Sequence, residues 1–130
     1  MIRNYHLDTN VIIDLLTQKL HPESQNLLYY LHENLELAIS KVVRAVLFSK
    51  KLEVDEKVGI ERFLSQTVEL PLMPSTANMA GIIRATFNLK LPDAMIAATA
   101  LELESTLVSS NSRCFKRVEG LQIKMPERSS

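Results

Sequence analysis

Residues 91–101 read Leu91-Pro92-Asp93-Ala94-Met95-Ile96-Ala97-Ala98-Thr99-Ala100-Leu101, and this stretch predicts a helix over residues 92–104. Pro92 suits the first turn, where its missing N–H would have no partner in any case. The helix has almost no polar side, and a helix that is apolar all round is normally buried between other layers of a fold. One carboxylate, Asp93, therefore stands at the start of a buried helix. Dipole complementarity, worth about 0.3–1 kcal/mol at a helix N-terminus, is one explanation for it; a functional role is the other.

The segments on either side of this helix alternate between helix and strand. Apolar residues at helical spacing predict a helix that Pro74-Ser75-Thr76 opens and that reaches Phe87. A strand over residues 105–108 follows the buried helix directly, and Ser109-Ser110-Asn111 then starts a turn or short helix. A last edge strand is predicted over residues 121–124, and the tail from Pro126 is expected to fray.

The first half of the chain shows the same alternation. Residues 41–50 could be strand or helix, but the i, i+1, i+4, i+5 spacing of Val42, Val43, Val46 and Leu47 favours a helix. In the helix that starts after Pro22 we expect Leu27, Leu28 and Leu31 to face inward. The remaining predictions are strands over 2–7, 35–39 and 67–72 and helices over 11–16 and 53–66. This order predicts one α/β domain over residues 1–125, with three α/β/α layers, a mostly parallel sheet and a tail over 126–130.

The composition excludes several classes of protein. The chain has 130 residues, of which 46% are hydrophobic, and its 15 basic residues balance its 15 acidic ones. Net charge therefore favours neither nucleic acid nor membrane as a partner, and RNA binding would need a local basic patch. Cys114 stands alone, which excludes an intrachain disulfide and a cysteine-rich zinc site. No apolar run approaches the roughly 20 residues of a membrane span, so we expect a soluble, cytoplasmic protein.

Polar side chains follow the predicted strands at the points where those strands end. In open α/β sheets, ligands bind outside the carboxyl ends of the strands. Asp8-Thr9-Asn10, Ser40 and Ser109-Ser110-Asn111 occupy such positions, and Asp93 lies at a helix start. Their oxygen-bearing side chains suit a hard cation such as Mg²⁺, and two carboxylates held together without a cation would repel each other. The alternative is that these residues are ordinary helix caps.

Three stretches together resemble the PIN-domain family, in the form of the single-domain ribonucleases that act as VapC-type toxins. They are Leu7-Asp8-Thr9-Asn10, the stretch over residues 91–100, and Leu107-Val108-Ser109-Ser110-Asn111 followed by Phe115. The resemblance covers essentially the whole chain. It implies a parallel sheet flanked by helices and cleavage of RNA that depends on Mg²⁺ or Mn²⁺ held by three or four acidic residues.

The acidic pattern of the family is only partly present. Asp8 and Asp93 match the first and third family acids, but the second, normally a glutamate six residues after Ser40, falls on Val46. A valine can neither bind a metal ion nor activate water. The fourth position falls on Asn111, which can donate a carbonyl ligand without charge, and a nearby position that is often acidic falls on Cys114.

The resemblance implies a role for each matched residue. We expect Asp8 and Asp93 to be metal ligands, and Asp8, Asp93 and Asn111 to be the catalytic residues. Substrate contacts are expected from Thr9, Asn10, Ser40, Ser109 and Arg113. Arg113, Lys116 and Arg117 form one local basic group, and a second consists of Lys41, Arg44, Lys50 and Lys51.

Two hypotheses from different classes follow. The first is a metal-dependent ribonuclease, the toxin half of a toxin–antitoxin pair, with RNA, an antitoxin protein and a second copy of itself as partners. The second is a catalytically degenerate PIN domain that binds RNA or a protein without cleavage. Val46 and Cys114 favour the second hypothesis, whereas Asp8 and Asp93 favour the first.

Overall fold

A five-stranded parallel sheet forms the middle layer of the molecule. The computed structural model describes residues 5–129, so the expected strand residues 2–4 lie outside the described part of the chain. The strand order is β3-β2-β1-β4-β5, and all four pairings are parallel. The strands are β1 (Tyr5–Leu7), β2 (Leu37–Ser40), β3 (Val68–Leu70), β4 (Thr106–Val108) and β5 (Ile123–Lys124).

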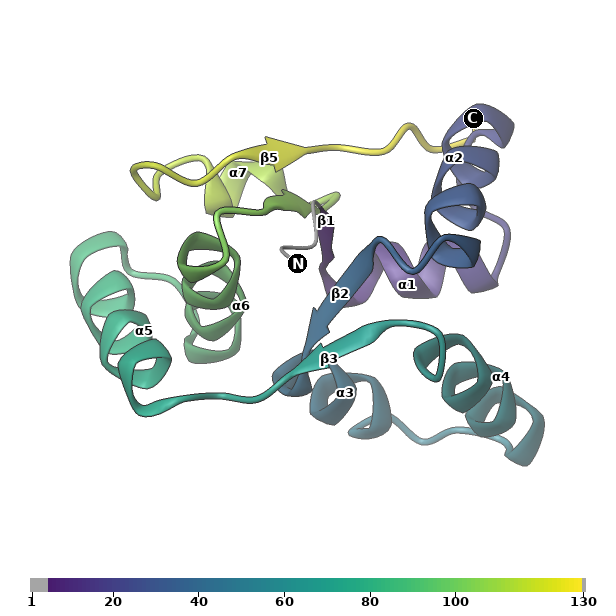
Figure 1. Ribbon diagram of the computed structural model, residues 1–130, viewed down its shortest axis with the longest axis horizontal. Helices are drawn as coiled ribbons and strands as arrows, with labels where there is room; N and C mark the ends of the chain where they lie inside the picture. The colour runs from purple at the N-terminus through teal and green to yellow at the C-terminus, as the bar shows by residue number, and fades with distance from the viewer. Residues whose placement is uncertain (1–4, 130) are drawn as a thin grey trace.

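Helices cover both faces of this sheet, as the alternating pattern predicts (Figure 1). Figure 1 shows α5 and α6 on one side of the central strands, with α1 and α2 on the other. Along the chain, β2 is added beside β1 and β3 beside β2. The chain then crosses back, and β4 is added on the other side of β1. The predicted three-layer α/β/α fold is therefore confirmed. The helices are α1 (Thr9–Leu16), α2 (Pro22–Glu33), α3 (Lys41–Phe48), α4 (Val54–Leu64), α5 (Pro74–Phe87), α6 (Leu91–Glu102) and α7 (Ser112–Phe115).

The helix expected to be buried, α6, is buried. Its five consecutive residues from Ile96 to Ala100 are all buried, as is Ala94. Their small side chains let α6 contact α3, α5 and β4. Pro92 lies in the first turn, and Asp93 beside it is half-buried. The burial of α6 therefore fixes the position of Asp93 at the end of the helix where α6 enters the core.

The ambiguous segment after β2 is helix α3, and its start is capped as expected. The N–H of Val42 donates to Ser40 Oγ at 3.1 Å, while Val43 and Leu47 are buried. The basic group expected on this segment is partly neutralised. Arg44 donates to Glu61 at 2.7 Å and to both carboxylate oxygens of Glu69. These ion pairs join α3 to α4 and β3.

Several boundaries differ from the sequence prediction. Strand β2 begins at Leu37 rather than Leu35, because Leu35 has a φ of 57°, which is incompatible with a strand. In α2, Leu28 and Leu31 are buried as expected, but Leu27 is 43% exposed. The prediction that Leu27 joins the core is wrong, because its side chain lines a cavity between α2 and the chain after β5.

The expectation of a frayed tail is also wrong for residues 126–129. The N–H of His21 donates to the carbonyl of Glu127 at 2.8 Å, and the N–H of Glu127 donates to Ser24 Oγ at 3.0 Å. Arg128 forms an ion pair with Asp14 at 3.3 Å. The tail is held because the loop between α1 and α2 offers a backbone partner and the two helices offer side-chain partners, which a sequence pattern does not reveal.

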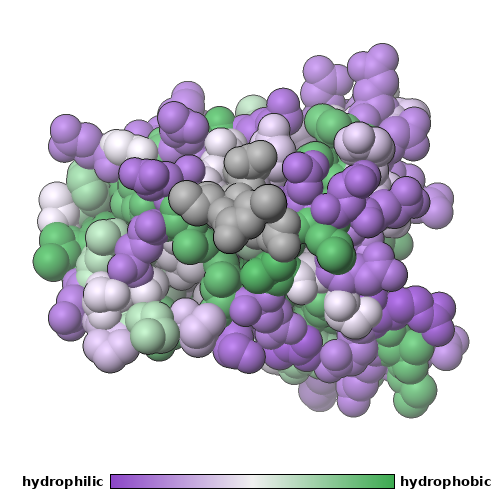
Figure 2. Space-filling model, in the orientation of Figure 1, coloured by the Kyte–Doolittle hydropathy of each residue, from purple (hydrophilic) through white to green (hydrophobic). Residues whose placement is uncertain are grey.

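The surface is mostly hydrophilic on the face seen in Figure 2. Hydrophilic residues gather over α2 and α4, and apolar ones are interspersed between them (Figure 2). Within residues 5–129, no helix combines the length and the apolar character needed to cross a lipid bilayer.

Candidate functional site

The sheet places a crevice between the carboxyl ends of β1 and β4. These strands are neighbours, yet the chain leaves them in opposite directions across the sheet, and open α/β sheets bind ligands at such a reversal of strand order. Leu7 pairs with Val108, so the residues that follow both strands meet. The N–H of Asp8 donates to the carbonyl of Val108 at 3.0 Å. A cavity of about 310 Å³ opens at this point.

The cavity brings together side chains that lie far apart in the sequence. Both expected metal ligands, Asp8 and Asp93, line it. So do Thr9, Asn10 and Asn111, which were expected to be catalytic or substrate-binding residues. The remaining lining residues are Val46, Lys50, Lys90, Pro92 and Ile96.

Asp8 is nearly buried, with 4% of its surface exposed. Its Oδ1 accepts a hydrogen bond from the N–H of Thr9 at 2.8 Å, and its Oδ2 accepts one from the hydroxyl of Ser109 at 2.8 Å. Burial raises the pKa of Asp8 because it disfavours the charged form, and the two hydrogen bonds act in the opposite direction. Asp8 is therefore held in one orientation by neighbours on both sides.

The negative charge of Asp8 acts on the carboxylate of Asp93. Burial raises the pKa of Asp93, the negative charge of Asp8 raises it further, and Lys90 lowers it. The Sγ atom of Cys114 lies 4.0 Å from Asp93 Oδ2, and burial together with the charge of Asp93 raises the pKa of this thiol. Two coupled carboxylates at the end of a buried helix are an arrangement that a bound cation would stabilise.

Ser109 supports Asp8 and does not line the cavity. It is fully buried, its hydroxyl donates to Asp8, and its Oγ accepts from the N–H of Asn111 at 3.0 Å. Ser40 is 1% exposed and caps α3, so it does not line the cavity either. Both serines were expected to contact substrate, but the structure places them behind the surface that a substrate could reach.

Replacing Ser109 by alanine is expected to reduce the free energy of unfolding by about 1–3 kcal/mol, because a buried carboxylate and the N–H of Asn111 each lose a partner. The measurement is urea denaturation near pH 7. Ser110→Ala is the matched control, because no side-chain hydrogen bond of Ser110 occurs among residues 5–129. Equal losses in the two variants would contradict the supporting role of Ser109.

Arg113 lies beside the cavity rather than in it. With Cys114, Lys116 and Arg117 it lines a neighbouring hollow, which shares Asn111 with the acidic cavity. The basic group expected after β4 is therefore next to the two acids.

Val46 lines the cavity, although its spacing on α3 suggested an ordinary core position. It is only partly buried, whereas Val43 and Leu47 on the same helix are buried. The position matched to the second family acid thus faces the cavity and carries an apolar side chain. Lys90 was not among the site residues expected from the sequence, and Lys50 was expected only as part of a local basic group. The available signal for Lys90 was its position three residues before Asp93.

The donor set suits a divalent cation that takes only part of its ligands from the protein. Mg²⁺ usually binds through one or two carboxylates and completes its shell with water and substrate phosphate. Asp8, Asp93 and the side-chain oxygen of Asn111 match this mode. The buried hydroxyl of Thr9, for which no hydrogen-bond partner occurs in the described structure, is a further oxygen at the same place. Within residues 5–129, no group of three or more His, Cys, Asp or Glu side chains is arranged to enclose a metal ion.

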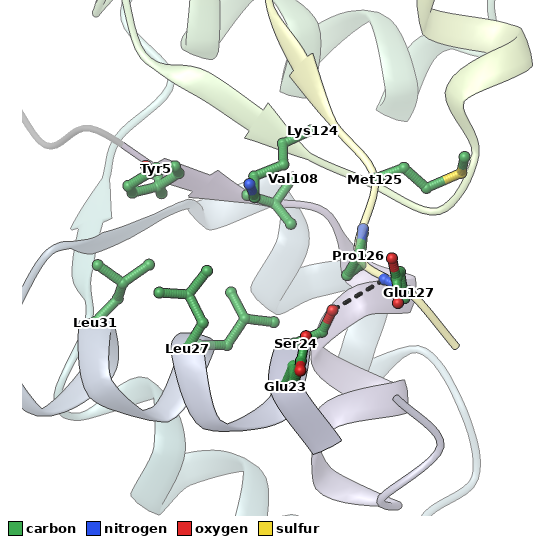
Figure 3. A pocket seen from close by; sticks show the side chains of 11 residues that line it. Tyr5, Glu23, Ser24, Leu27, Leu31, Val108, Lys124, Met125, Pro126 and Glu127 are labelled. Atoms are coloured by element: carbon green, nitrogen blue, oxygen red, sulfur yellow. Dashed lines mark hydrogen bonds between the residues drawn. The ribbon is translucent and has the colours of Figure 1, made fainter. Parts of the chain in front are cut away.

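A second cavity, of about 220 Å³, lies between α2 and the chain after β5 (Figure 3). Figure 3 shows Leu27 and Leu31 pointing from α2 toward Tyr5 and Val108, which gives the cavity an apolar floor. Glu23 and Glu127 lie at the end of the cavity next to the C-terminal tail. This cavity contains neither Asp8 nor Asp93, and its polar lining residues are Glu23, Ser24, Lys124 and Glu127.

Comparisons with known proteins agree with this architecture. VapBC2 from Rickettsia felis, solved with a promoter DNA fragment, is 27% identical with a TM-score of 0.79, covering 93% of this chain and 97% of that one. DNA-bound VapBC from Salmonella typhimurium is 24% identical with a TM-score of 0.75, covering 94% and 97%. A toxin–antitoxin complex from Klebsiella pneumoniae is 23% identical with a TM-score of 0.74, covering 97% and 100%.

No curated protein sequence matches the chain. The family model of the PIN domain, in contrast, matches residues 5–121. This span begins with β1 and ends just before β5, so it includes every element that positions Asp8 and Asp93. The chain belongs to the PIN domain family.

Proposed function

We propose that the protein is a VapC-type toxin that hydrolyses RNA with Mg²⁺ or Mn²⁺ at the cavity of Asp8 and Asp93. One observation carries the proposal: the two carboxylates that match the family acids line a single cavity at the switch point of the sheet. The match to the PIN domain and the likeness to VapBC2 from Rickettsia felis support the same activity.

Each residue of the cavity has a part in this proposal. Asp8 and Asp93 would hold the cation, and Asn111 would supply a neutral oxygen ligand or hold a water molecule. A divalent cation would supply positive charge for the phosphate and activate water for attack on phosphorus. Ser109 and Thr9 orient Asp8 through their hydrogen bonds. Asn10 is exposed at the cavity and Arg113 lies next to it, which supports our proposal that both contact the RNA.

A degenerate PIN domain that binds without cutting is the second candidate. Val46 favours it, because this side chain reaches the cavity where the family pattern has a carboxylate. The two candidates differ in whether Asp8 and Asp93 alone hold enough metal for hydrolysis.

Replacing Val46 by glutamate is expected to raise Mn²⁺ affinity and RNA cleavage by about tenfold or more. A third carboxylate beside a divalent cation contributes several kcal/mol even at an effective dielectric constant of about 20, and about 1.4 kcal/mol is a factor of ten. The measurement is cleavage of single-stranded RNA in Mn²⁺ by the wild type, Val46→Glu and Val46→Gln, the last as a control of similar size without charge.

The outcomes separate the two candidates. Cleavage by the wild type that Val46→Glu increases and Val46→Gln does not supports the ribonuclease. An inert wild type together with an active Val46→Glu variant supports the degenerate PIN domain. If neither protein cuts RNA, the proposed activity is wrong.

We propose an antitoxin protein as the physiological partner, since the neighbour from Klebsiella pneumoniae is a toxin–antitoxin complex and the other two neighbours described above are VapBC2 and VapBC. We also propose that the protein forms a homodimer in the cytoplasm. Ile82 of α5 is 66% exposed and Met73 before the helix is 53% exposed, so both apolar side chains are available for a contact with a second copy.

A further inference from the structure

Two lysines line the cavity beside the two carboxylates. Lys50 follows Ser49, the C-cap residue of α3, and Lys90 precedes the first residue of α6. They come from segments 40 residues apart in the sequence, and both side chains are exposed. The cavity therefore contains two formal negative and two formal positive charges.

Neither lysine forms an ion pair. Among residues 5–129, the cations within 4 Å of a carboxylate are Lys41, Arg44 and Arg128. Lys90 influences Asp93 through its charge without contacting it. The ammonium groups of Lys50 and Lys90 are thus available to an anion that enters the cavity.

The carboxylates alone would repel such an anion. Asp8 and Asp93 are held together in a partly buried site, where like charges and an incoming phosphate interact more strongly than in bulk water. Two lysines at the same opening offset that repulsion. The hollow of Arg113, Lys116 and Arg117 adjoins the cavity through Asn111, so cations lie on more than one side of the acids.

We propose that Lys50 and Lys90 bind an RNA phosphate in the cavity and so offset the repulsion between that phosphate and the carboxylates of Asp8 and Asp93. This inference rests on the proposed function in one respect, that RNA is the ligand. It assigns the two lysines as substrate-binding residues and does not depend on whether the bound RNA is cut.

The test measures binding of a fluorescently labelled, short single-stranded RNA by anisotropy in EDTA, where metal-dependent cleavage cannot occur. The proteins are the wild type, Lys50→Ala, Lys90→Ala, the double variant and Lys57→Ala. Lys57 is an exposed lysine on α4 that does not line the cavity, so its variant has the same net charge as each single variant. Each affinity is measured between about 50 and 200 mM salt.

Each cavity lysine is expected to contribute one phosphate contact. The slope of log affinity against log salt should flatten by about 0.7 for each single variant and about 1.4 for the double variant, while Lys57→Ala keeps the wild-type slope. A double variant with the slope and affinity of Lys57→Ala overturns the inference, as does a wild type that does not bind the RNA. If the lysines pass this test and the wild type does not cleave RNA in Mn²⁺, the proposed ribonuclease fails while the phosphate site stands.

Discussion

Asp8→Asn is expected to reduce Mn²⁺-dependent RNA cleavage by at least about a hundredfold. Removing a single preorganised electrostatic group from an active site commonly costs about 10²–10³ in rate. Asparagine has nearly the same shape as aspartate, so the loss would come from the missing charge. The measurement is the initial rate of RNA cleavage at a fixed Mn²⁺ concentration.

The same substitution should not unfold the protein. Burial already raises the pKa of Asp8, which means that its negative charge costs free energy in the folded state. Asp8→Asn removes that cost and keeps an oxygen that can accept from Thr9 or Ser109. We therefore expect a melting temperature no lower than that of the wild type. Asp55→Asn, at an exposed position in the first turn of α4, is the matched control and should cut RNA at the wild-type rate. Wild-type cleavage by Asp8→Asn would contradict the assignment.

The second large effect is loss of stability in acid through His6. This residue lies on the central strand β1, is fully buried, and neither ring nitrogen has a hydrogen-bond partner in the described structure. Burial lowers the pKa of His6 from 6.5 to about 4. The neutral form is thus favoured in the folded protein, whereas the unfolded chain takes up a proton as soon as the pH falls below about 6.5.

Between these two pKa values the unfolded chain binds more protons than the folded protein, so stability falls as the pH is lowered. The stability that depends on neutral His6 is complete above about pH 6.5 and is lost progressively as the pH falls from about 6.5 to about 4. The shift corresponds to about 3 kcal/mol at the acid end of that range. Asp8 and Asp93 act in the opposite direction, because their pKa values are raised in the folded state and protonation relieves their burial.

The His6 contribution is isolated by comparing the wild type with His6→Leu in urea denaturation at several pH values between 7 and 4. Leucine fits the buried strand position and does not titrate. The wild type is expected to lose about 3 kcal/mol more than His6→Leu across this range. Parallel pH dependences for the two proteins would show that His6 is not protonated on unfolding.

The fold followed from the sequence wherever burial and local chemistry agreed. Residues 94–98 were predicted to be buried because they offer no solvent-facing side chain, and Ser40 was expected to cap a helix because serine is a favoured N-cap residue. Strand ends were predicted less well. Leu35 fits an apolar strand pattern, and only the path of the chain out of α2 gives it a positive φ. The tail was mispredicted because its partners, His21 and Ser24, are brought to it by tertiary structure.

The sequence predicted the acidic residues of the site but did not predict its lysines. Asp8 and Asp93 follow from the rule for strand ends and helix starts, and the cavity contains both of them. Lys50 lies just after the end of α3, and Lys90 lies just before the start of α6. Nothing in the sequence spacing of these two lysines indicates that they line the same cavity. The position of Val46 in the cavity was likewise not predictable from the sequence. Its helical spacing is that of a core residue, but the opening between α3 and α6 exposes it to the cavity.

The central claim is that Asp8 and Asp93 share a divalent cation, and calorimetric titration of Mn²⁺ into the wild type and Asp8→Asn tests it most directly. The wild type should bind one Mn²⁺ ion in a saturable titration, and Asp8→Asn should reduce the affinity by at least about tenfold, because it removes one of two charged ligands. Identical titrations for the two proteins, or no saturable binding by the wild type, would contradict the claim.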